Sequence, residues 1–260
     1  MISQKKIKEE LNTYNPNFII IVGEKGSGKK TLLRESYGDK AYWLPDNSVE
    51  AVREMTKEAN RRHNALFIIP DADNMSINAK NSLLKVVEEC KNNNAFIMTV
   101  QDEYNVLETL TSRAHILYFE PYTPEELFRY FWEEYPNGDP NDAELTKFCA
   151  TPGEVDTLVK MGGREFYDYM LKVVDFIDET NISNALKIGT AISFKDEEDK
   201  YDLLMFWKMF VSCCEERLSE DTEKYSDWIK ITSEAIRKLR ITGVNKSALF
   251  TLWILDIRGE

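Results

Sequence analysis

Between about residue 17 and residue 120, short apolar runs alternate with stretches that carry apolar residues at helical spacing. This alternation predicts a parallel α/β sheet in which helices connect successive strands. Wholly apolar runs such as FIII and LFII further predict that helices cover both faces of the sheet. The predicted strands are 17–22, 41–44, 65–69, 95–100 and 115–119, and the predicted helices lie near 30–37, 48–60, 77–90 and 104–110.

Beyond Pro121 the pattern becomes helical. The run TPEELFRYFWEEY opens with a threonine cap, a proline at the first helical position and acidic residues in the first turn, which together predict a helix start. Turn-forming residues near 136–140, 151–153 and 161–163 punctuate the rest. We therefore predict an α/β domain over 1–121, a small helical lid over 122–164 and an all-helical domain over 165–260.

Composition narrows the choice of compartment and ligand. The 260 residues carry a formal net charge of -12, which opposes general attraction to nucleic acid, although a basic strip or basic partners could still bring the chain to DNA. No signal-like block or run of 18 apolar residues stands in the sequence, so we expect a cytoplasmic protein that has no contact with membranes. The four cysteines form no CxxC pair, so we expect reduced core thiols and no zinc.

A candidate phosphate-binding loop follows the first predicted strand. The run GEKGSGKKT matches GxxxxGK between a strand and a helix, which is the context that such a P-loop requires. Its glycines let backbone amides surround phosphate oxygens, and its lysine can reach the outer phosphates. The expected nucleotide-binding residues are Gly23, Gly26, Ser27, Gly28, Lys29, Lys30 and Thr31. The alternative is a glycine-rich surface turn.

One position in this loop departs from the pattern of hydrolysing enzymes. The residue after Gly28-Lys29 is ordinarily Ser or Thr, whose hydroxyl binds magnesium, and here it is Lys30. Thr31 comes one place later, and a one-residue offset turns a helical side chain by about 100°. We therefore expect nucleotide binding to be retained better than hydrolysis.

An acidic site is expected after the strand 65–69. If the pattern is hhhhDExD, Pro70 replaces the magnesium aspartate and Asp71 replaces the catalytic glutamate. In the other register Asp71 is itself a metal ligand. A third interpretation is that Asp71 and Asp73 cap the helix that starts near Ser76.

The segment PDADNMSINAKNSLLKVVEE, residues 70–89, resembles the sequence after the acidic motif in clamp-loader subunits of the AAA+ superfamily. The agreement extends over Asp73, Met75, Ala79, Asn81, Leu83, Leu84, Lys85, Glu88 and Glu89. Residues 48–53 resemble that family's IxxIR helix and 96–98 its FIL strand. Ser112-Arg113-Ala114 resembles its SRC motif, with alanine in place of cysteine.

This resemblance implies an AAA+ core, a helical lid and a helical collar that joins sister subunits in a ring. It also implies that Arg113 enters a neighbour's ATP site as an arginine finger, whereas a Ser-Arg pair alone is more often a solvated surface feature. The delta-prime subunit of bacterial DNA polymerase III is the most similar type, because GKK is common there. The segment 151–155 resembles the family's second sensor but lacks its arginine, and 243–249 resembles the last collar helix.

Taken together, these features predict a clamp-loader subunit that binds ATP or ADP, with Mg²⁺ as a further candidate, and hydrolyses little itself. Its expected partners are other loader subunits, a sliding clamp and, through the complex, primed DNA. A phage-encoded or reduced form would explain the short chain. Two alternatives stay open, namely a self-sufficient AAA+ ATPase that uses Lys29 with Asp71, and an interaction scaffold that binds no nucleotide.

Overall fold

The computed structural model describes residues 4–13, 17–88, 92–191, 202–239 and 244–259. The chain packs as two compact units. The first comprises Met1–Glu126 together with Thr151–Gly153, and the second comprises Leu127–Ala150 and Glu154–Glu260. No helix in the described residues is long and apolar enough to cross a membrane. Cys90, Glu89 and Gly243, on which parts of the sequence interpretation rest, lie outside the described residues.

A five-stranded parallel sheet forms the centre of the first unit. Its strands are β1 (Phe18–Val22), β2 (Ala41–Trp43), β3 (Leu66–Ile69), β4 (Ala95–Val100) and β5 (His115–Tyr118), in the order β2-β3-β4-β1-β5. Every predicted strand is present, with bounds that differ by at most one residue. The α/β fold class is therefore confirmed, and the wholly buried β1 lies between β4 and β5.

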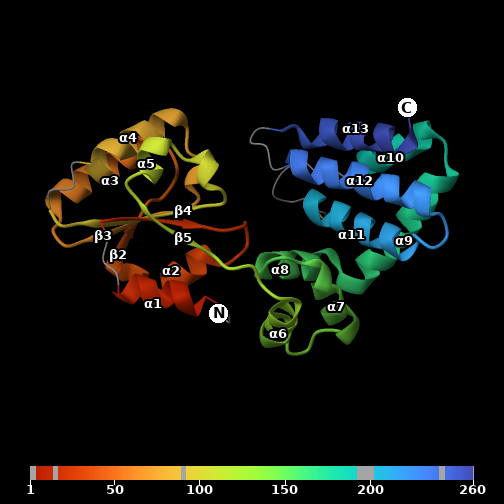
Figure 1. Ribbon diagram of the computed structural model, residues 1–260, viewed down its shortest axis with the longest axis horizontal. Helices are drawn as coiled ribbons and strands as arrows, with labels where there is room; N and C mark the ends of the chain where they lie inside the picture. Colours follow the sequence, from red (N-terminus) through yellow and green to blue (C-terminus); the bar gives the residue numbers. More distant parts are fainter. Residues whose placement is uncertain (1–3, 14–16, 89–91, 192–201, 240–243, 260) are drawn as a thin grey trace. The chain divides into compact units, whose positions relative to one another are not determined.

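Helices cover both faces of this sheet, as its apolar strands predicted (Figure 1). Helices α1 (Lys5–Thr13) and α2 (Lys29–Tyr37) bury Ile7 and Leu32 against one face. Helices α3 (Val49–Arg61), α4 (Ile77–Glu88) and α5 (Glu108–Thr111) bury Val52, Leu83 and Leu110 against the other. Short 3₁₀ turns lie at η1 (Gly38–Lys40), η2 (Ala72–Asn74) and η3 (Glu103–Asn105). The predicted helix 104–110 is wrong in extent, since η3 and the four-residue α5 take its place.

The second unit is helical throughout its described part. It contains all but the first residues of α6 (Pro124–Glu134) and of α8 (Pro152–Met161). Its other elements are α7 (Pro140–Leu145), the 3₁₀ turn η4 (Thr146–Phe148), α9 (Gly163–Glu179), α10 (Ile182–Ala191), α11 (Leu203–Glu216), α12 (Thr222–Leu239) and α13 (Lys246–Arg258). Aromatic rings fill the space between α11, α12 and α13. The ring centroid of Phe210 lies 4.9 Å from that of Trp253 and 5.9 Å from that of Trp228. Buried edge-to-face ring pairs add to the stabilisation from area burial alone.

The predicted boundary between residues 164 and 165 falls inside α9. The start of α9 is held to α7, because the Arg164 backbone N–H donates a hydrogen bond to Asp142 Oδ1 at 2.6 Å. The division of the helical half into a lid and a collar stays a prediction.

Cys149, Cys213 and Cys214 are buried, and burial raises the pKa of each thiol to about 12.

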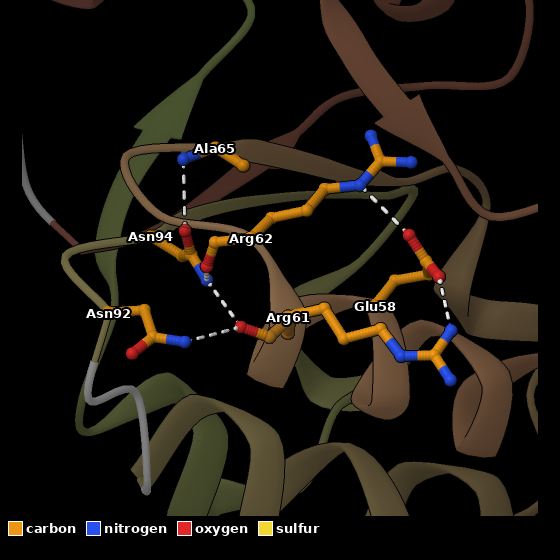
Figure 2. Close-up of polar contacts among 7 residues, drawn as sticks. Glu58, Arg61, Arg62, Ala65, Asn92 and Asn94 are labelled. Atoms are coloured by element: carbon orange, nitrogen blue, oxygen red, sulfur yellow. Dashed lines mark hydrogen bonds and ion pairs between the residues drawn. The ribbon is translucent and has the colours of Figure 1, made fainter.

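Asparagine side chains hold the turn between α3 and β3 (Figure 2). Asn94 is 1% exposed; its Nδ2 donates to Ala59 O at 2.8 Å and to Arg62 O at 3.1 Å, and its Oδ1 accepts from Ala65 N at 2.9 Å. Asn92 Nδ2 also donates to Ala59 O, at 3.1 Å. These bonds satisfy carbonyls that the end of a helix leaves without partners, and they fix where β3 enters the sheet.

Replacing Asn94 with alanine should destabilise the protein, because it removes the hydrogen bonds to Arg62 O and Ala65 N and one of the two to Ala59 O. The free energy of unfolding should fall by about 1–3 kcal/mol, measured by urea denaturation followed by circular dichroism. Asn60→Ala is the matched control, since Asn60 is an exposed residue near the end of the same helix. Equal denaturation midpoints for Asn94→Ala and the unmutated protein would contradict the role given to this side chain.

Candidate nucleotide-binding site

The loop 23–28 connects the end of β1 to the start of α2. The Gly23 N–H donates to Val100 O at 3.1 Å, which ties the start of the loop to β4, and the Ser27 N–H donates to Glu24 O at 3.2 Å. Gly26 and Gly28 have φ of 80° and 91°, a region that residues with a Cβ rarely adopt. A glycine loop between a central parallel strand and a helix N-terminus is the arrangement that P-loops use to bind phosphate.

Lys29 is the first residue of α2, and its side chain is turned into this loop. The residue is 6% exposed, and its Nζ donates hydrogen bonds to Gly23 O and, at 2.9 Å, to Glu24 O. Burial lowers the pKa of Lys29, while the carboxylates of Asp71, Asp73 and Glu24 act in the opposite direction. Anionic phosphate oxygens would stabilise this buried ammonium more strongly than the neutral carbonyls do.

Ser27 and Tyr122 complete the inner surface of the loop. Ser27 is 4% exposed, and its Oγ makes no hydrogen bond within the part of the chain that the structure describes. Tyr122 donates from its hydroxyl to Ser27 O at 2.8 Å. A buried hydroxyl without a partner beside a buried ammonium fits an oxygen-rich anion, so the residues present suit a nucleotide phosphate.

The loop also contacts the short segment Thr151–Gly153, which packs in the same unit. Gly153 N–H donates to Gly26 O at 3.0 Å, and Thr151 Oγ1 donates to Lys25 O at 3.3 Å. A Cβ on Gly153 would lie 2.7 Å from Gly26 Cα, so this approach of two backbones requires glycine. The segment is the one that resembled the family's second sensor, and it reaches the loop by backbone atoms without an arginine.

Lys30 and Asp71 form an ion pair across the site. Asp71 follows β3 in the left-handed region, with φ 50° and ψ 47°. Two hydrogen bonds hold it there: its N–H donates to the buried Thr99 Oγ1 at 3.0 Å, and its carbonyl accepts from Asn47 Nδ2 at 3.0 Å. Thr31 is exposed on α2. The Lys30 ammonium thus contacts the carboxylate of Asp71, the residue that the sequence suggested as a metal ligand.

These residues do not fit a magnesium ion. Magnesium needs several oxygen ligands in nearly octahedral geometry, and here Lys30 replaces a hydroxyl while Pro70 offers no carboxylate. No group of three His, Cys, Asp or Glu side chains in the described residues is placed to hold a metal. Asp71 remains the one candidate ligand from the sequence, and its carboxylate is paired with Lys30.

Asp73 has a structural partner in the loop after β4. Its Oδ2 accepts from the Gln101 N–H at 2.8 Å and its Oδ1 from the Asp102 N–H at 3.4 Å. The cap of α4 is instead Ser76, whose Oγ accepts from the Ala79 N–H at 3.2 Å. The interpretation of Asp73 as a cap for this helix is therefore wrong, because its carboxylate accepts from the loop after β4.

Arg113 lies at the other edge of the sheet. It precedes β5, whereas the P-loop and Asp71 follow β1 and β3, and parallel strands begin at one edge and end at the other. The Arg113 side chain is 46% exposed; its Nη1 donates to Thr109 O at 2.7 Å and its Nη2 pairs with Glu88 Oε1 at 2.9 Å. Its place in the sheet separates this guanidinium from the phosphate loop of its own chain.

Sequence reasoning missed several residues that shape the site. Thr99, Asn47 and Tyr122 hold Asp71 and Ser27 through side-chain hydrogen bonds. Thr99 could have been found, because it is the polar residue in the otherwise apolar run AFIMTV of β4. Asn47 and Tyr122 lie in connecting segments, where no periodicity marks a partner far away in the sequence.

Comparison with known proteins finds similarity to subunits of DNA polymerase III and replication factor C. A family model described as DNA polymerase III, delta subunit, matches residues 5–123. The chain is 26% identical over 174 residues to replication factor C small subunit 2 of Pyrobaculum islandicum, covering 58% of this chain and 54% of that protein. It is 35% identical over 74 residues to DNA polymerase III subunit delta' of Bacillus subtilis, covering 28% of this chain and 22% of that protein. The chain thus spans about half of the first relative and less of the second.

A solved structure supports the same fold. A DNA polymerase III gamma subunit-related protein from Thermotoga maritima superposes with a TM-score of 0.52 at 13% identity, covering 98% of each chain. At this identity the likeness concerns the fold alone.

Thr99→Val should release the Asp71 backbone while keeping the shape of the buried side chain. Without its acceptor, the Asp71 N–H should exchange with solvent deuterium roughly tenfold to a hundredfold faster, as expected for loss of a buried hydrogen bond worth about 1–3 kcal/mol. Hydrogen exchange of the peptide containing Asp71 measures this. Thr99→Ser keeps the hydroxyl and should keep the protection; equal exchange in both variants would contradict the assignment.

Proposed function

We propose that this chain, which is similar to subunits of DNA polymerase III and replication factor C, is a clamp-loader subunit that binds nucleotide and hydrolyses little or none of it. The observation that carries this proposal is a contrast between the residues around the loop 23–28. Gly26, Gly28 and the buried Lys29 are arranged for phosphate, while Lys30 pairs with Asp71 where a hydrolysing site requires oxygen ligands for a metal.

Weak hydrolysis follows from what water activation requires. Phosphoryl transfer in P-loop enzymes depends on a metal that neutralises developing charge and on a group that orients water. In this chain Pro70 stands at the first acidic position, and the Asp71 carboxylate is engaged by an ammonium. Bound ATP would therefore persist.

We further propose that Arg113 acts in the ATP site of a neighbouring subunit. Its position at the strand-start edge, its half-exposed guanidinium and the resemblance of 112–114 to the SRC motif support this role. A guanidinium offers a planar pair of donors to the oxygens of a transferring phosphoryl group. The Glu88 carboxylate holds it in the free chain by an exposed ion pair, and such pairs contribute little to stability, so a phosphate can replace Glu88 readily.

The partners that this role implies are sister subunits and a sliding clamp, with primed DNA reached through the assembled complex. The net charge of -12 supports an indirect contact with DNA, because affinity for phosphate polyanions comes mainly from lysine and arginine. Collar-type assembly through the helices after residue 164 belongs to the same proposal.

The purified chain should bind ATP and ADP, and Lys29→Ala should abolish binding, because the buried ammonium is the charge that faces the phosphates. Binding is measured by the displacement of a fluorescent nucleotide and by the ligand-induced rise in melting temperature. Lys40→Ala, which alters an exposed lysine in η1, is the control. ATP turnover should stay near background; a rate of about 1 per second would favour the self-sufficient ATPase, and no binding at millimolar nucleotide would favour the scaffold.

Arg113→Ala should lower the ATPase rate of a reconstituted loader while leaving this chain's stability, nucleotide binding and assembly nearly unchanged. Arginine fingers contribute roughly 10³ to 10⁵ in rate in well-studied phosphoryl-transfer systems. Lysine should rescue poorly, since a point charge cannot reproduce the planar contact.

Arg61→Ala is the matched control for this test, because Arg61 is also an exposed arginine paired with a glutamate. Its removal should leave the rate unchanged. A normal rate for the Arg113→Ala complex, measured with DNA and clamp present, would refute the finger role.

A further inference from the structure

Lys30 stands at the backbone position from which a P-loop hydroxyl ordinarily ligates magnesium. From the first turn of α2 its ammonium reaches the Asp71 carboxylate, which follows β3. The ion pair thus joins the same two elements, the start of α2 and the end of β3, that a magnesium ion joins in a hydrolysing P-loop protein. We propose that the Lys30 ammonium serves as a built-in counter-ion, so that this site binds the phosphates of ATP or ADP without a divalent cation.

This inference rests on the proposed nucleotide binding and deepens it. The charges around the buried Lys29 include those of Lys30, Glu24, Asp71 and Asp73. Three carboxylates in this neighbourhood disfavour an anionic ligand, so a second cation is needed besides Lys29. Lys30 supplies that cation and at the same time neutralises Asp71, the carboxylate that it contacts.

The exposure of the pair leaves the ammonium accessible to a ligand. The Lys30 and Asp71 side chains are 48% and 38% exposed, so neither is sealed inside the protein. A lysine ammonium has three N–H donors, and those not directed to Asp71 are free to meet phosphate oxygens. An ion pair at this exposure is also weak enough in water for the ammonium to shift toward a phosphate.

The same geometry opposes a divalent cation. A magnesium ion beside Asp71 would lie next to the Lys30 ammonium, and repulsion between like charges disfavours that arrangement. Asp71 cannot move away readily, because Thr99 and Asn47 hold its backbone from both sides. The hydroxyl and carboxylate ligands that would offset the repulsion are replaced by Lys30 and Pro70.

The test compares the affinities of ATP and ADP in excess EDTA and in millimolar magnesium chloride, using the full chain and isothermal titration calorimetry. The unmutated protein should bind with the same affinity, within about threefold, in both conditions. Lys30→Thr restores the ordinary hydroxyl and removes the ammonium, so its affinity in EDTA should fall roughly tenfold to a hundredfold, as for the loss of one charge-assisted contact. Lys30→Arg keeps the positive charge and should keep binding in EDTA.

Lys57→Thr is the matched control, since Lys57 is an exposed helical lysine paired with Glu54 at 2.8 Å, and its affinities should equal those of the unmutated protein. Circular dichroism confirms that each variant is folded. Binding by the unmutated protein only when magnesium is present would overturn the counter-ion role and leave the proposed function standing. Undiminished binding by Lys30→Thr in EDTA would also overturn it. The absence of binding in either condition would instead refute the proposed nucleotide binding itself, and with it this inference.

Discussion

The parallel pairing of β1 with β4 and β5 is the constraint on which the rest of the first unit depends. Because all five strands run the same way, every strand ends at one edge of the sheet. The P-loop after β1, Asp71 after β3 and the loop after β4 are therefore neighbours, although they lie far apart in the sequence. Arg113, which precedes a strand, is placed at the other edge by the same rule. The parallel topology thus separates the glycine loop after β1 from the Arg113 guanidinium.

Strands were the most predictable part of this fold, because each is a short run of mainly apolar residues that can be recognised without knowing its neighbours, and β1, β3 and β4 are almost wholly buried. Helix α1 was missed, since Ile7 and Leu11 are the main apolar residues of a highly charged segment, and burial of Ile7 against the sheet stabilises the helix only after folding. The predicted helix 104–110 failed for a related reason. Its apolar residues do pack in the core, but Val106 and Leu107 do so from the link between η3 and α5, and Leu110 from the short α5.

In the candidate site, too, the features set by neighbouring residues could be predicted from the sequence, whereas the contacts between residues far apart in it could not. The positive φ angles of Gly26 and Gly28 belong to a local motif, so the loop was visible in the sequence. The Lys30–Asp71 ion pair and the hydrogen bond from Asp71 to Thr99 join elements that meet only in the folded sheet. Sequence reasoning recognised that Lys30 was an unusual residue for a metal site. It could not show that this lysine meets the candidate metal ligand itself.

On the proposed function, the close approach of Gly26 and Gly153 gives nucleotide a role in a subunit that does not hydrolyse it. Nucleotide that binds the folded loop stabilises the contacts that this loop makes. The size of the effect depends on the nucleotide concentration relative to the dissociation constant. The Gly153–Gly26 and Thr151–Lys25 hydrogen bonds belong to that set. Without turnover the stabilisation is constant through a reaction cycle. On the proposed function, nucleotide in this subunit is therefore a fixed structural ligand, and the changes that drive the cycle arise in the neighbouring site that Arg113 enters.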